Sequence, residues 1–356
     1  MLRFLFPLRQ YLSGFNVFQY ITFRAAYAAI TALLLSFLLG PAVIARLRAR
    51  KASWTAREDT PSSHQAKAGT PTMGGVLILV AVVSSVLLWQ DPSSLHTWML
   101  VFAAVAFGAI GFVDDVLKMK ARKGISAGVK FGGQILISAL IVVVLYVQRT
   151  DTTTLLYLPF FKHAVLDLSW LYVPFAIVLM VGYSNAVNLT DGLDGLAIGL
   201  VIMVALALTV LAYVSGRPDF ADYLQIPFIK GGGEIAVFCL AVVGAAVGFL
   251  WFNAHPADVW MGDTGSLSLG GVLGVVALIL KKEVLILVLG GVFVLETLSV
   301  AIQVISFKLT GRRVFKMAPL HHHFELSGWQ ESKVVARLWI LGGLFAILGL
   351  STLKIQ

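Results

Sequence analysis

Long apolar stretches constrain this chain more than any other feature of its sequence. A helix needs about 20 mostly apolar residues to cross a bilayer core, and stretches of that kind recur along the whole chain. Of the 356 residues, 58% are hydrophobic and only 13% are charged, against roughly 25% charged residues in an average soluble domain. This pattern excludes an ordinary globular enzyme, a soluble domain on a single anchor and a cleaved signal peptide as its explanation.

Ten segments fit a membrane-spanning helix. They are continuous apolar runs rather than alternating ten-residue segments, which excludes a transmembrane β-barrel. The sequence therefore predicts an all-α polytopic membrane protein, a single domain over residues 1–356. The single Cys239 excludes disulfides and cysteine-based metal sites. The predicted spans are residues 20–45, 72–90, 97–113, 131–148, 171–187, 196–214, 234–252, 266–281, 284–305 and 336–354.

The basic residues predict the orientation of the chain. Ten spans place both termini on one side of the membrane, and 17 of the 27 Lys and Arg residues fall in loops 46–70, 114–130 and 306–337 of the other side. The positive-inside rule makes these loops cytoplasmic and both termini periplasmic. The net charge of +9 thus marks topology and predicts no nucleic-acid partner. On the periplasmic side, residues 151–170 are predicted to form a short β-hairpin.

Acidic residues are scarce, and three tight groups of them fall at the predicted cytoplasmic ends of the spans. Charges at a span end are costly unless they are paired, hydrated or bound to a cation, so the groups predict a functional site. The loops predicted to form it are 46–71, 114–130, 188–195, 253–265 and 306–335. The groups are Asp114 with Asp115, Asp191 with Asp194, and Asp258 with Asp263.

The first group reads Asp114-Asp115-Val-Leu-Lys118. Adjacent side chains point in different directions on a helix, whereas Asp114 and Lys118 share a face because they are four residues apart. One carboxylate can therefore face a cleft while the other binds a second ligand or packs locally. The sequence leaves open which carboxylate does which, and a solvated helix end is the alternative.

The second group lies in Asn185-Ala-Val-Asn188-Leu-Thr-Asp191-Gly-Leu-Asp194-Gly195. Its glycines and polar side chains interrupt a membrane helix, and irregular backbone at that depth is tolerated where it lines a cavity. A plain connecting turn would not need both Asn185 and Asn188.

The third group places Asp263 between two glycines just before a new span. Its carboxylate and the neighbouring backbone amides can approach a ligand closely there. Carboxylate oxygens together with phosphate suit Mg²⁺, whereas zinc favours His or Cys. The sequence contains neither a Walker A motif nor a Gly-x-Ser-x-Gly nucleophile elbow.

The last predicted cytoplasmic loop contains Pro319-Leu-His321-His322-His323-Phe-Glu325. Three consecutive imidazoles diverge around a helix or along a strand, so they cannot all bind one zinc ion. We expect one or two of them to face the acidic cleft and bind a phosphate or neutral ligand groups. The alternative is that the cluster only caps a basic loop.

Taken together, these four motifs resemble the polyprenyl-phosphate N-acetylhexosamine-1-phosphate transferases, also called glycosyltransferase family 4. The His-His-His-Phe-Glu form is similar to the phospho-N-acetylmuramoyl-pentapeptide transferases within that superfamily. The resemblance covers essentially the whole chain. It implies Mg²⁺-dependent transfer of phospho-MurNAc-pentapeptide from UDP-MurNAc-pentapeptide to undecaprenyl phosphate, giving lipid I and UMP. It also implies a homodimer among membrane lipids, in the bacterial inner membrane, with its active site on the cytoplasmic face.

The resemblance also implies roles for individual residues. Asp263, with Asp191, would bind Mg²⁺, and Asp114 or Asp115 would orient or deprotonate the lipid phosphate. Trp260 stands where relatives often carry Phe. Stacking of its ring on the base is therefore expected, and the resemblance leaves the geometry of this stacking undetermined. The implied substrate-binding residues are Lys67 near the uracil, Thr72, Lys118 and Lys130 at the phosphates, Asn185, Asn188, Asp191, Gly192, Leu193, Asp194, Asn253 and Ser266 around the nucleotide and metal, Trp260, Gln303, and His321, His322 and His323 at the sugar-phosphate or peptide side.

Several alternatives remain open from the sequence. A sibling enzyme that transfers GlcNAc-1-phosphate to the same lipid is the nearest, although the triple-His motif argues against it. A secondary transporter would show inverted repeats and carboxylates near the bilayer centre, and we find no repeat. Glu296 and Gln303 share a face of the ninth predicted span and border either the lipid entrance or a helix contact. Direct attack by the lipid phosphate and a covalent aspartyl intermediate both remain open, as does the preferred peptide variant.

Overall fold

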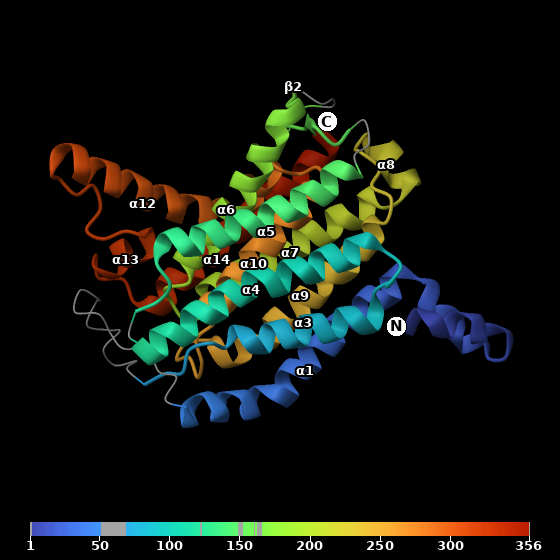
Figure 1. Ribbon diagram of the computed structural model, residues 1–356, viewed down its shortest axis with the longest axis horizontal. Helices are drawn as coiled ribbons and strands as arrows, with labels where there is room; N and C mark the ends of the chain where they lie inside the picture. The colour runs from blue at the N-terminus through green and yellow to red at the C-terminus, as the bar shows by residue number, and fades with distance from the viewer. Residues whose placement is uncertain are drawn as a thin grey trace.

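The computed structural model describes residues 2–50, 69–121, 123–148, 152–159, 161 and 166–355. These residues form a bundle of helices (Figure 1), nine of which are long and apolar enough to cross a membrane. The chain is therefore a multi-pass membrane protein. The nine are α1 (Ile21–Ala49), α4 (Leu95–Ala121), α5 (Ala127–Val147), α6 (Tyr172–Thr190), α7 (Leu196–Ser215), α9 (Gly232–Asn253), α10 (Gly262–Ile279), α12 (Gly291–Thr310) and α14 (Glu331–Ile355).

Two of the predicted spans differ from the others. Residues 72–90 give α3 (Gly75–Trp89), whose 15 residues span about 22 Å at 1.5 Å per residue, less than the thickness of a bilayer core. Residues 284–305 are divided at Gly290 into α11 (Leu285–Leu289) and α12. The count of ten spans and the periplasmic termini therefore stay predictions.

The remaining elements are short. Two 3-10 helices, η1 (Leu2–Gln10) and η2 (Ser13–Gln19), precede α1 and extend beyond the main body of the bundle (Figure 1). In the segment predicted as a hairpin, β1 (Leu155–Leu156) pairs antiparallel with β2 (Leu166–Asp167). The others are η3 (Ser169–Leu171), α8 (Pro218–Leu224) and α13 (Leu320–Glu325).

Helix α10 lies at the centre of the bundle and is buried along almost its whole length. It packs against α3, α4 and α6. Small residues along it permit this close packing: the Ser268 hydroxyl donates a hydrogen bond to the carbonyl of Ala104 on α4, and the Ser184 hydroxyl on α6 donates to the carbonyl of Leu267. The second turn of α10 is thereby held between neighbouring helices.

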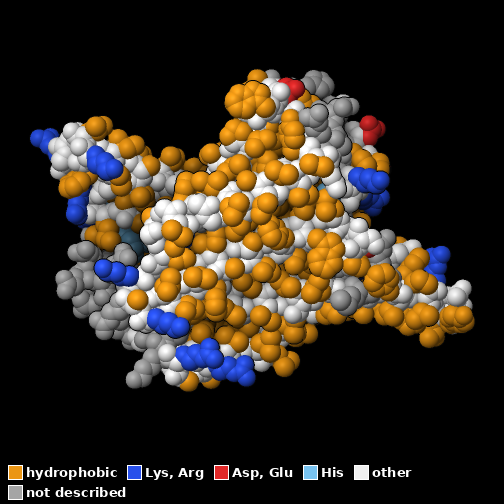
Figure 2. Space-filling view, in the orientation of Figure 1, with side chains coloured by type: hydrophobic (Ala, Val, Ile, Leu, Met, Phe, Trp, Pro, Cys, Tyr) orange, Lys and Arg blue, Asp and Glu red, His pale blue; other side chains and the backbone are white. Residues whose placement is uncertain are grey.

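The outer surface is strongly apolar. Leu38, Val147 and Leu309 are each more than three-quarters exposed. On the face drawn in Figure 2, hydrophobic side chains cover the middle of the bundle, whereas Lys and Arg gather toward its two ends. Such a surface is stable against lipid tails and would be an aggregation hazard in water.

Candidate functional site

The carboxylate of Asp115, near the end of α4, caps the first turn of α10. It accepts hydrogen bonds from the backbone N–H groups of Asp263 and Thr264, at 3.2 and 2.9 Å, and from the Thr264 hydroxyl at 2.6 Å. An anionic acceptor at a helix N-terminus satisfies free N–H groups and interacts favourably with the helix dipole. Gly111, one helical turn before Asp115, permits this approach because a Cβ there would lie 2.1 Å from the Asp263 carbonyl oxygen.

Two lysines and an amide surround the Asp263 carboxylate. The Nζ atoms of Lys118 and Lys130 lie 3.0 and 2.5 Å from its Oδ2 atom, and the Asn188 side-chain amide donates to its Oδ1 atom at 3.1 Å. Lys118 also lies 2.6 Å from Oδ2 of Asp114. One lysine thus joins two of the acidic groups that the sequence singled out.

The adjacent carboxylates Asp114 and Asp115 have different partners, although both are buried. Besides Lys118, Asp114 accepts a hydrogen bond from the backbone N–H of Ile125 at 2.6 Å. Asp115 is occupied by the first turn of α10. The alternative of a merely solvated helix end does not describe this pair, because each side chain is almost fully covered.

Asp191 lies just after the end of α6, and none of the cations that the structure describes is recorded as its partner. Removal from water, followed by the negative charges of Asp263, Asp115 and Asp194, raises the pKa of Asp191 to about 8. A carboxyl group in such surroundings takes up a proton or a cation readily. The surroundings of Asp191 are thus electrostatically suited to a bound cation.

The two asparagines at the end of α6 face different neighbours. Asn188 donates to the Ser266 hydroxyl at 2.7 Å as well as to Asp263, and Ser266 in turn donates to the carbonyl of Gly262. Asn185 donates to the side-chain oxygen of Gln134 on α5 and to the carbonyl of Val181. Asn188 therefore contacts the cluster of Asp263, Lys118 and Lys130, called the Asp263 cluster below. Asn185 instead connects α6 to α5 by a hydrogen bond.

Asp194 forms a second polar centre close to the first. Its carboxylate accepts hydrogen bonds from the Trp260 indole N–H at 3.0 Å and the Ala257 backbone N–H at 3.3 Å, and it lies 2.9 Å from Nδ1 of His255. Its backbone N–H donates to Oε1 of Glu331 at the start of α14. The indole edge of Trp260 is thus fixed by Asp194.

Two groups of side chains could hold a metal ion. One is Asp263 with Asp191, on which the Asp263 charge acts; the other is Asp194, His255 and Glu331, whose ligand atoms lie within 4.8 Å of one another. The oxygens of both groups already have partners, since Asp194 accepts N–H groups from Trp260 and Ala257 and Asp263 contacts Lys118, Lys130 and Asn188. A hard cation such as Mg²⁺ prefers carboxylate oxygens and phosphate, which favours the first group because the second includes the imidazole of His255.

Asn253 connects the turn between α6 and α7 to the segment before α10. Its side chain accepts a hydrogen bond from the Gly195 N–H at 3.1 Å and donates to the Val259 carbonyl at 2.9 Å. Gly195 has a φ of +77°, a conformation that glycine adopts without strain.

Thr72 lies beside the start of α10, since its hydroxyl oxygen is 3.0 Å from the position that a Cβ on Gly262 would occupy. Leu193 is buried in the same turn as Gly195.

The three histidines have three different partners. His321 is buried, and its Nδ1 atom lies 3.2 Å from Oε2 of Glu296 on α12. His322 pairs with Glu325 at 2.9 Å, and Nδ1 of His323 accepts a hydrogen bond from the Lys316 N–H. This divergence is the geometry expected of consecutive side chains.

Of the three histidines, His321 faces the turn after α6, which carries Asp191 and Asp194. A Cβ on Gly192, next to Asp191, would lie 2.3 Å from its Nε2 atom. Within the described part of the chain this buried Nε2 atom has no hydrogen-bond partner. Its other ring nitrogen is held by Glu296, so Nε2 is the atom left to bind a ligand.

Gln303 forms hydrogen bonds with the backbone of the loop after α12 rather than with the acidic residues of the site. Its side-chain oxygen accepts hydrogen bonds from the N–H groups of Val314 and Phe315, and its amide donates to the Phe315 carbonyl. The shared face predicted for Glu296 and Gln303 thus has two uses: Glu296 holds His321, and Gln303 fixes the loop after α12.

The structure brings together most of the residues predicted for the site, from α4, α5, α10, α13 and the turn after α6. Lys67 lies outside the described residues. Sequence reasoning missed His255, Glu331, Gln134 and Thr264. His255 and Glu331 lie in predicted cytoplasmic loops, which was the available signal, but their convergence on Asp194 depends on tertiary packing.

Comparisons with known proteins show the family of the chain. The sequence pattern of glycosyl transferase family 4 matches residues 97–281, and signature 1 of the phospho-N-acetylmuramoyl-pentapeptide-transferases matches residues 67–79. The chain is similar to proteins of that name from Koribacter versatilis (52% identity, covering 96% of this chain and 95% of the relative), Syntrophus aciditrophicus (50%, covering 99% of each) and Nitratidesulfovibrio vulgaris (52%, covering 99% of each). The chain therefore belongs to glycosyl transferase family 4 and, within it, to the phospho-N-acetylmuramoyl-pentapeptide-transferases.

Proposed function

We propose that this transferase moves phospho-MurNAc-pentapeptide from UDP-MurNAc-pentapeptide to undecaprenyl phosphate, giving lipid I and UMP, in the first membrane step of peptidoglycan synthesis. The names of its relatives support the transferred group. The observation that carries the proposal is the cluster in which Lys118 and Lys130 meet Asp263 at the first turn of α10. Its lysines offer positive charge to phosphate oxygens, and its carboxylates offer ligands to a cation.

Phosphoryl transfer depends mostly on positioning and on neutralising charge. In the proposed reaction, an oxygen of the lipid phosphate forms a bond to the phosphorus attached to the sugar, and the bond from that phosphorus to UMP breaks. Lys118 and Lys130 would exchange part of their interaction with Asp263 for the oxygens of the diphosphate. A water-soluble donor and a membrane lipid can meet there only if the cluster lies at a membrane face, which we propose is the cytoplasmic face of the inner membrane.

The residues present fit Mg²⁺. Asp191 and Asp263 would hold it, because the negative charge of Asp263 acts on Asp191 in addition to desolvation, and a bound cation would offset the repulsion between the two carboxylates. A bound Mg²⁺ would supply Lewis-acid stabilisation of the charge on the phosphate oxygens. Asn188, which donates to Asp263, would keep that carboxylate in its orientation.

The different partners of the adjacent carboxylates favour Asp114 as the group that orients or deprotonates the lipid phosphate. Asp115 already binds the first turn of α10 through Asp263 and Thr264, whereas Asp114 contacts Lys118, the side chain that we propose binds the phosphates. We propose direct attack by the lipid phosphate as the simplest reaction at this cluster.

The nucleotide would bind beside Asp194, where Trp260 presents its indole ring and Asn253 orders the turn. Gly192, Leu193, Thr72 and Lys67 complete the proposed nucleotide site, with Asn185 and Ser266 supporting it. His321, through its free Nε2 atom, and His322 would contact the sugar-phosphate; His323 and Gln303 would act by ordering the loop that carries the histidines.

A homodimer is part of the proposal. Sedimentation of the purified protein in detergent would test it, with a single monomeric species contradicting this part alone.

The enzymatic proposal is tested by supplying purified protein with undecaprenyl phosphate, Mg²⁺ and one of two donors. We expect UMP release with UDP-MurNAc-pentapeptide, little with UDP-GlcNAc, and none in excess EDTA. Release with UDP-GlcNAc alone would establish the sibling reaction instead. Equal release from UDP-MurNAc-pentapeptide with and without EDTA would remove Mg²⁺ from the proposal.

A further inference from the structure

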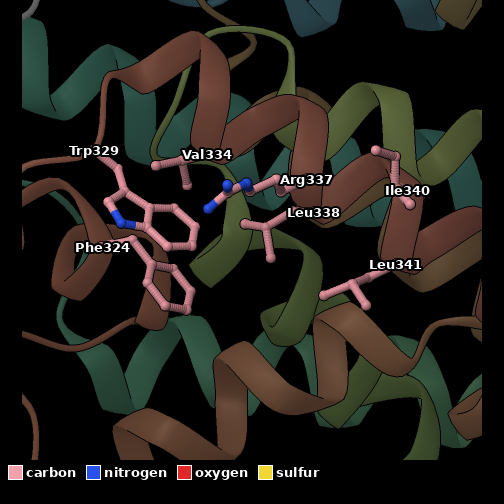
Figure 3. A pocket seen from close by; sticks show the side chains of 7 residues that line it. All are labelled: Phe324, Trp329, Val334, Arg337, Leu338, Ile340 and Leu341. Atoms are coloured by element: carbon pink, nitrogen blue, oxygen red, sulfur yellow. The ribbon is translucent and has the colours of Figure 1, made fainter.

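An apolar groove of about 320 Å³ lies between α13 and the first three turns of α14. Figure 3 shows Val334, Leu338 and Leu341 in a row along α14, with the rings of Phe324 and Trp329 together at the end near Val334. Val334 and Leu338 are buried at its floor, whereas Leu341 is 42% exposed at its rim. From Val334 to Leu341 the helix rises about 10 Å, so the groove has an elongated apolar wall.

The aromatic wall of the groove carries a positive charge. The rings of Phe324 and Trp329 are stacked with centroids 4.8 Å apart, and the guanidinium of Arg337 lies 4.0 Å from the centroid of Trp329. Tryptophan beside a basic residue is typical of the boundary between lipid tails and headgroups. Arg337 lies in the second turn of a helix long and apolar enough to cross the membrane, which places its charge near such a boundary.

A second cation stands on the same face of α14. Lys333 and Arg337 are four residues apart, so their side chains are neighbours, and two like charges at this spacing repel each other. Both are exposed, and the ion pairs recorded for the described residues include neither. Glu331, the nearest acid in sequence, accepts the Asp194 N–H instead. Arg337, which lines the groove, and its helical neighbour Lys333 thus offer two positive charges to an anion bound there.

We infer that this groove binds an anionic membrane phospholipid, with one acyl chain along Val334, Leu338 and Leu341 and the headgroup phosphate at Arg337 and Lys333. Basic pockets beside membrane helices on the cytoplasmic side bind anionic headgroups in this way. The extensive contacts of α14 are with α7, α11, α12 and α13, whereas Asp263 and its partners Lys118, Lys130 and Asn188 lie on α10, α4, α5 and α6. None of the residues that line the groove belongs to the Asp263 cluster, although α13 also carries His321 and α14 begins at Glu331, which contacts Asp194. We therefore assign the groove to a second lipid, distinct from the acceptor of the proposed reaction.

Native mass spectrometry of the detergent-purified chain tests the inference. Phosphatidylglycerol and phosphatidylcholine with identical acyl chains would be titrated separately. We expect phosphatidylglycerol to bind more tightly, and Arg337→Met or Lys333→Gln to lower its affinity about fivefold. Lys308→Gln, which removes an exposed cation from the far end of α12, is the matched control and should leave the affinity unchanged. Equal binding of the two lipids, or an equal effect of all three substitutions, would overturn the inference.

A second measurement locates the lipid. Brominated phosphatidylglycerol quenches nearby tryptophans, and we expect the quenched fraction of the fluorescence to fall in Trp329→Phe relative to the wild type. No difference between the two would contradict binding at this groove. Displacement of the bound phospholipid by an equimolar amount of undecaprenyl phosphate would assign the groove to the acceptor lipid. Disulfide cross-linking between two Leu341→Cys chains in the absence of lipid would assign the groove to a second copy of the protein. Either result would overturn the inference.

Discussion

Asp115 and Thr264 are joined by two hydrogen bonds, from the backbone N–H and the hydroxyl of Thr264, at 2.9 and 2.6 Å. Through them the end of α4 sets the position of the first turn of α10, which carries Asp263. The paired aspartates of α4 therefore have separate tasks. Asp115 positions a neighbouring helix, and Asp114 remains beside Lys118 at the cluster.

These separate tasks predict different consequences of removing each carboxylate. Asp115→Ala should lower the free energy of unfolding by about 1 kcal/mol, the usual cost of losing a helix cap, and should lower turnover because Asp263 shifts. Asp114→Asn keeps the shape of the side chain and should abolish most turnover with little change in melting temperature. Thermal unfolding in detergent and UMP release measure the two effects, and identical profiles for both variants would contradict the division of tasks.

Lys130 is expected to contribute to turnover through charge. It lies 2.5 Å from Asp263, where it can face developing charge on the phosphates. Lys130→Met should lower kcat about 100-fold, the usual effect of removing one stabilising group aimed at the transition state. Lys120→Met, which removes an exposed cation from the last turn of α4, is the control and should retain full activity. A loss of the same size in both variants would show that general basicity, rather than this contact, is required.

The close approach of α4 to α10 depends on a missing side chain. A Cβ on Gly111 would lie 2.1 Å from the Asp263 carbonyl oxygen, whereas a Cβ on Gly343 of α14 would meet no atom within 4 Å. Gly111→Ala should therefore lower both the melting temperature and turnover. Gly343→Ala should raise stability by up to about 1 kcal/mol, because alanine is the better helix former. Normal turnover in Gly111→Ala would contradict the proposed packing constraint.

Glu296 is expected to act through His321. Its carboxylate holds Nδ1 of the imidazole, which leaves Nε2 directed toward Gly192. Glu296→Leu should lower kcat tenfold or more, since a small misplacement of a positioned group has effects up to about 100-fold. In Glu296→Gln the amide oxygen can still accept a hydrogen bond from the Nδ1–H group of His321, so this variant should retain most of the wild-type activity. Equal loss in the Leu and Gln variants would show that the negative charge itself, not the orientation of His321, is what matters.

Lys282 predicts a dependence of stability on pH. It follows the end of α10 and is 4% exposed, and burial lowers the pKa of its ammonium to about 8. Because the pKa in the folded protein lies below the unfolded value, the buried charge destabilises the fold below pH 8, and this penalty is lost as the pH rises toward about 10. Lys282→Met should therefore be more stable than the wild type at pH 7, and the difference should narrow by pH 10. A difference in melting temperature that is constant across this range would contradict the prediction.

The sequence predicted the helical architecture well because apolar runs of sufficient length have few other uses. It did not predict the break at Gly290 or the short α3, since a continuous apolar run carries no signal for either. The structure brings Asp263 into contact with Lys118, Lys130 and Asn188, whereas the roles predicted for these residues stay predictions. The contact of Asp194 with His255 and Glu331 was not predicted. Local periodicity shows which face of a helix is buried but not which distant segment covers it.

Formation of the lipid-linked product tests the central proposal most directly. The wild type, Asp263→Asn and Asp258→Asn would each be incubated with UDP-MurNAc-pentapeptide, undecaprenyl phosphate and Mg²⁺. Mass spectrometry of the extracted lipids would then detect the product by its mass. Asp258 is an exposed acid whose recorded partner is Arg48, so its substitution is the control. We expect undecaprenyl-diphospho-MurNAc-pentapeptide from the wild type and Asp258→Asn, and none from Asp263→Asn. Absence of this product from folded wild-type protein, or its normal formation by Asp263→Asn, would contradict the account.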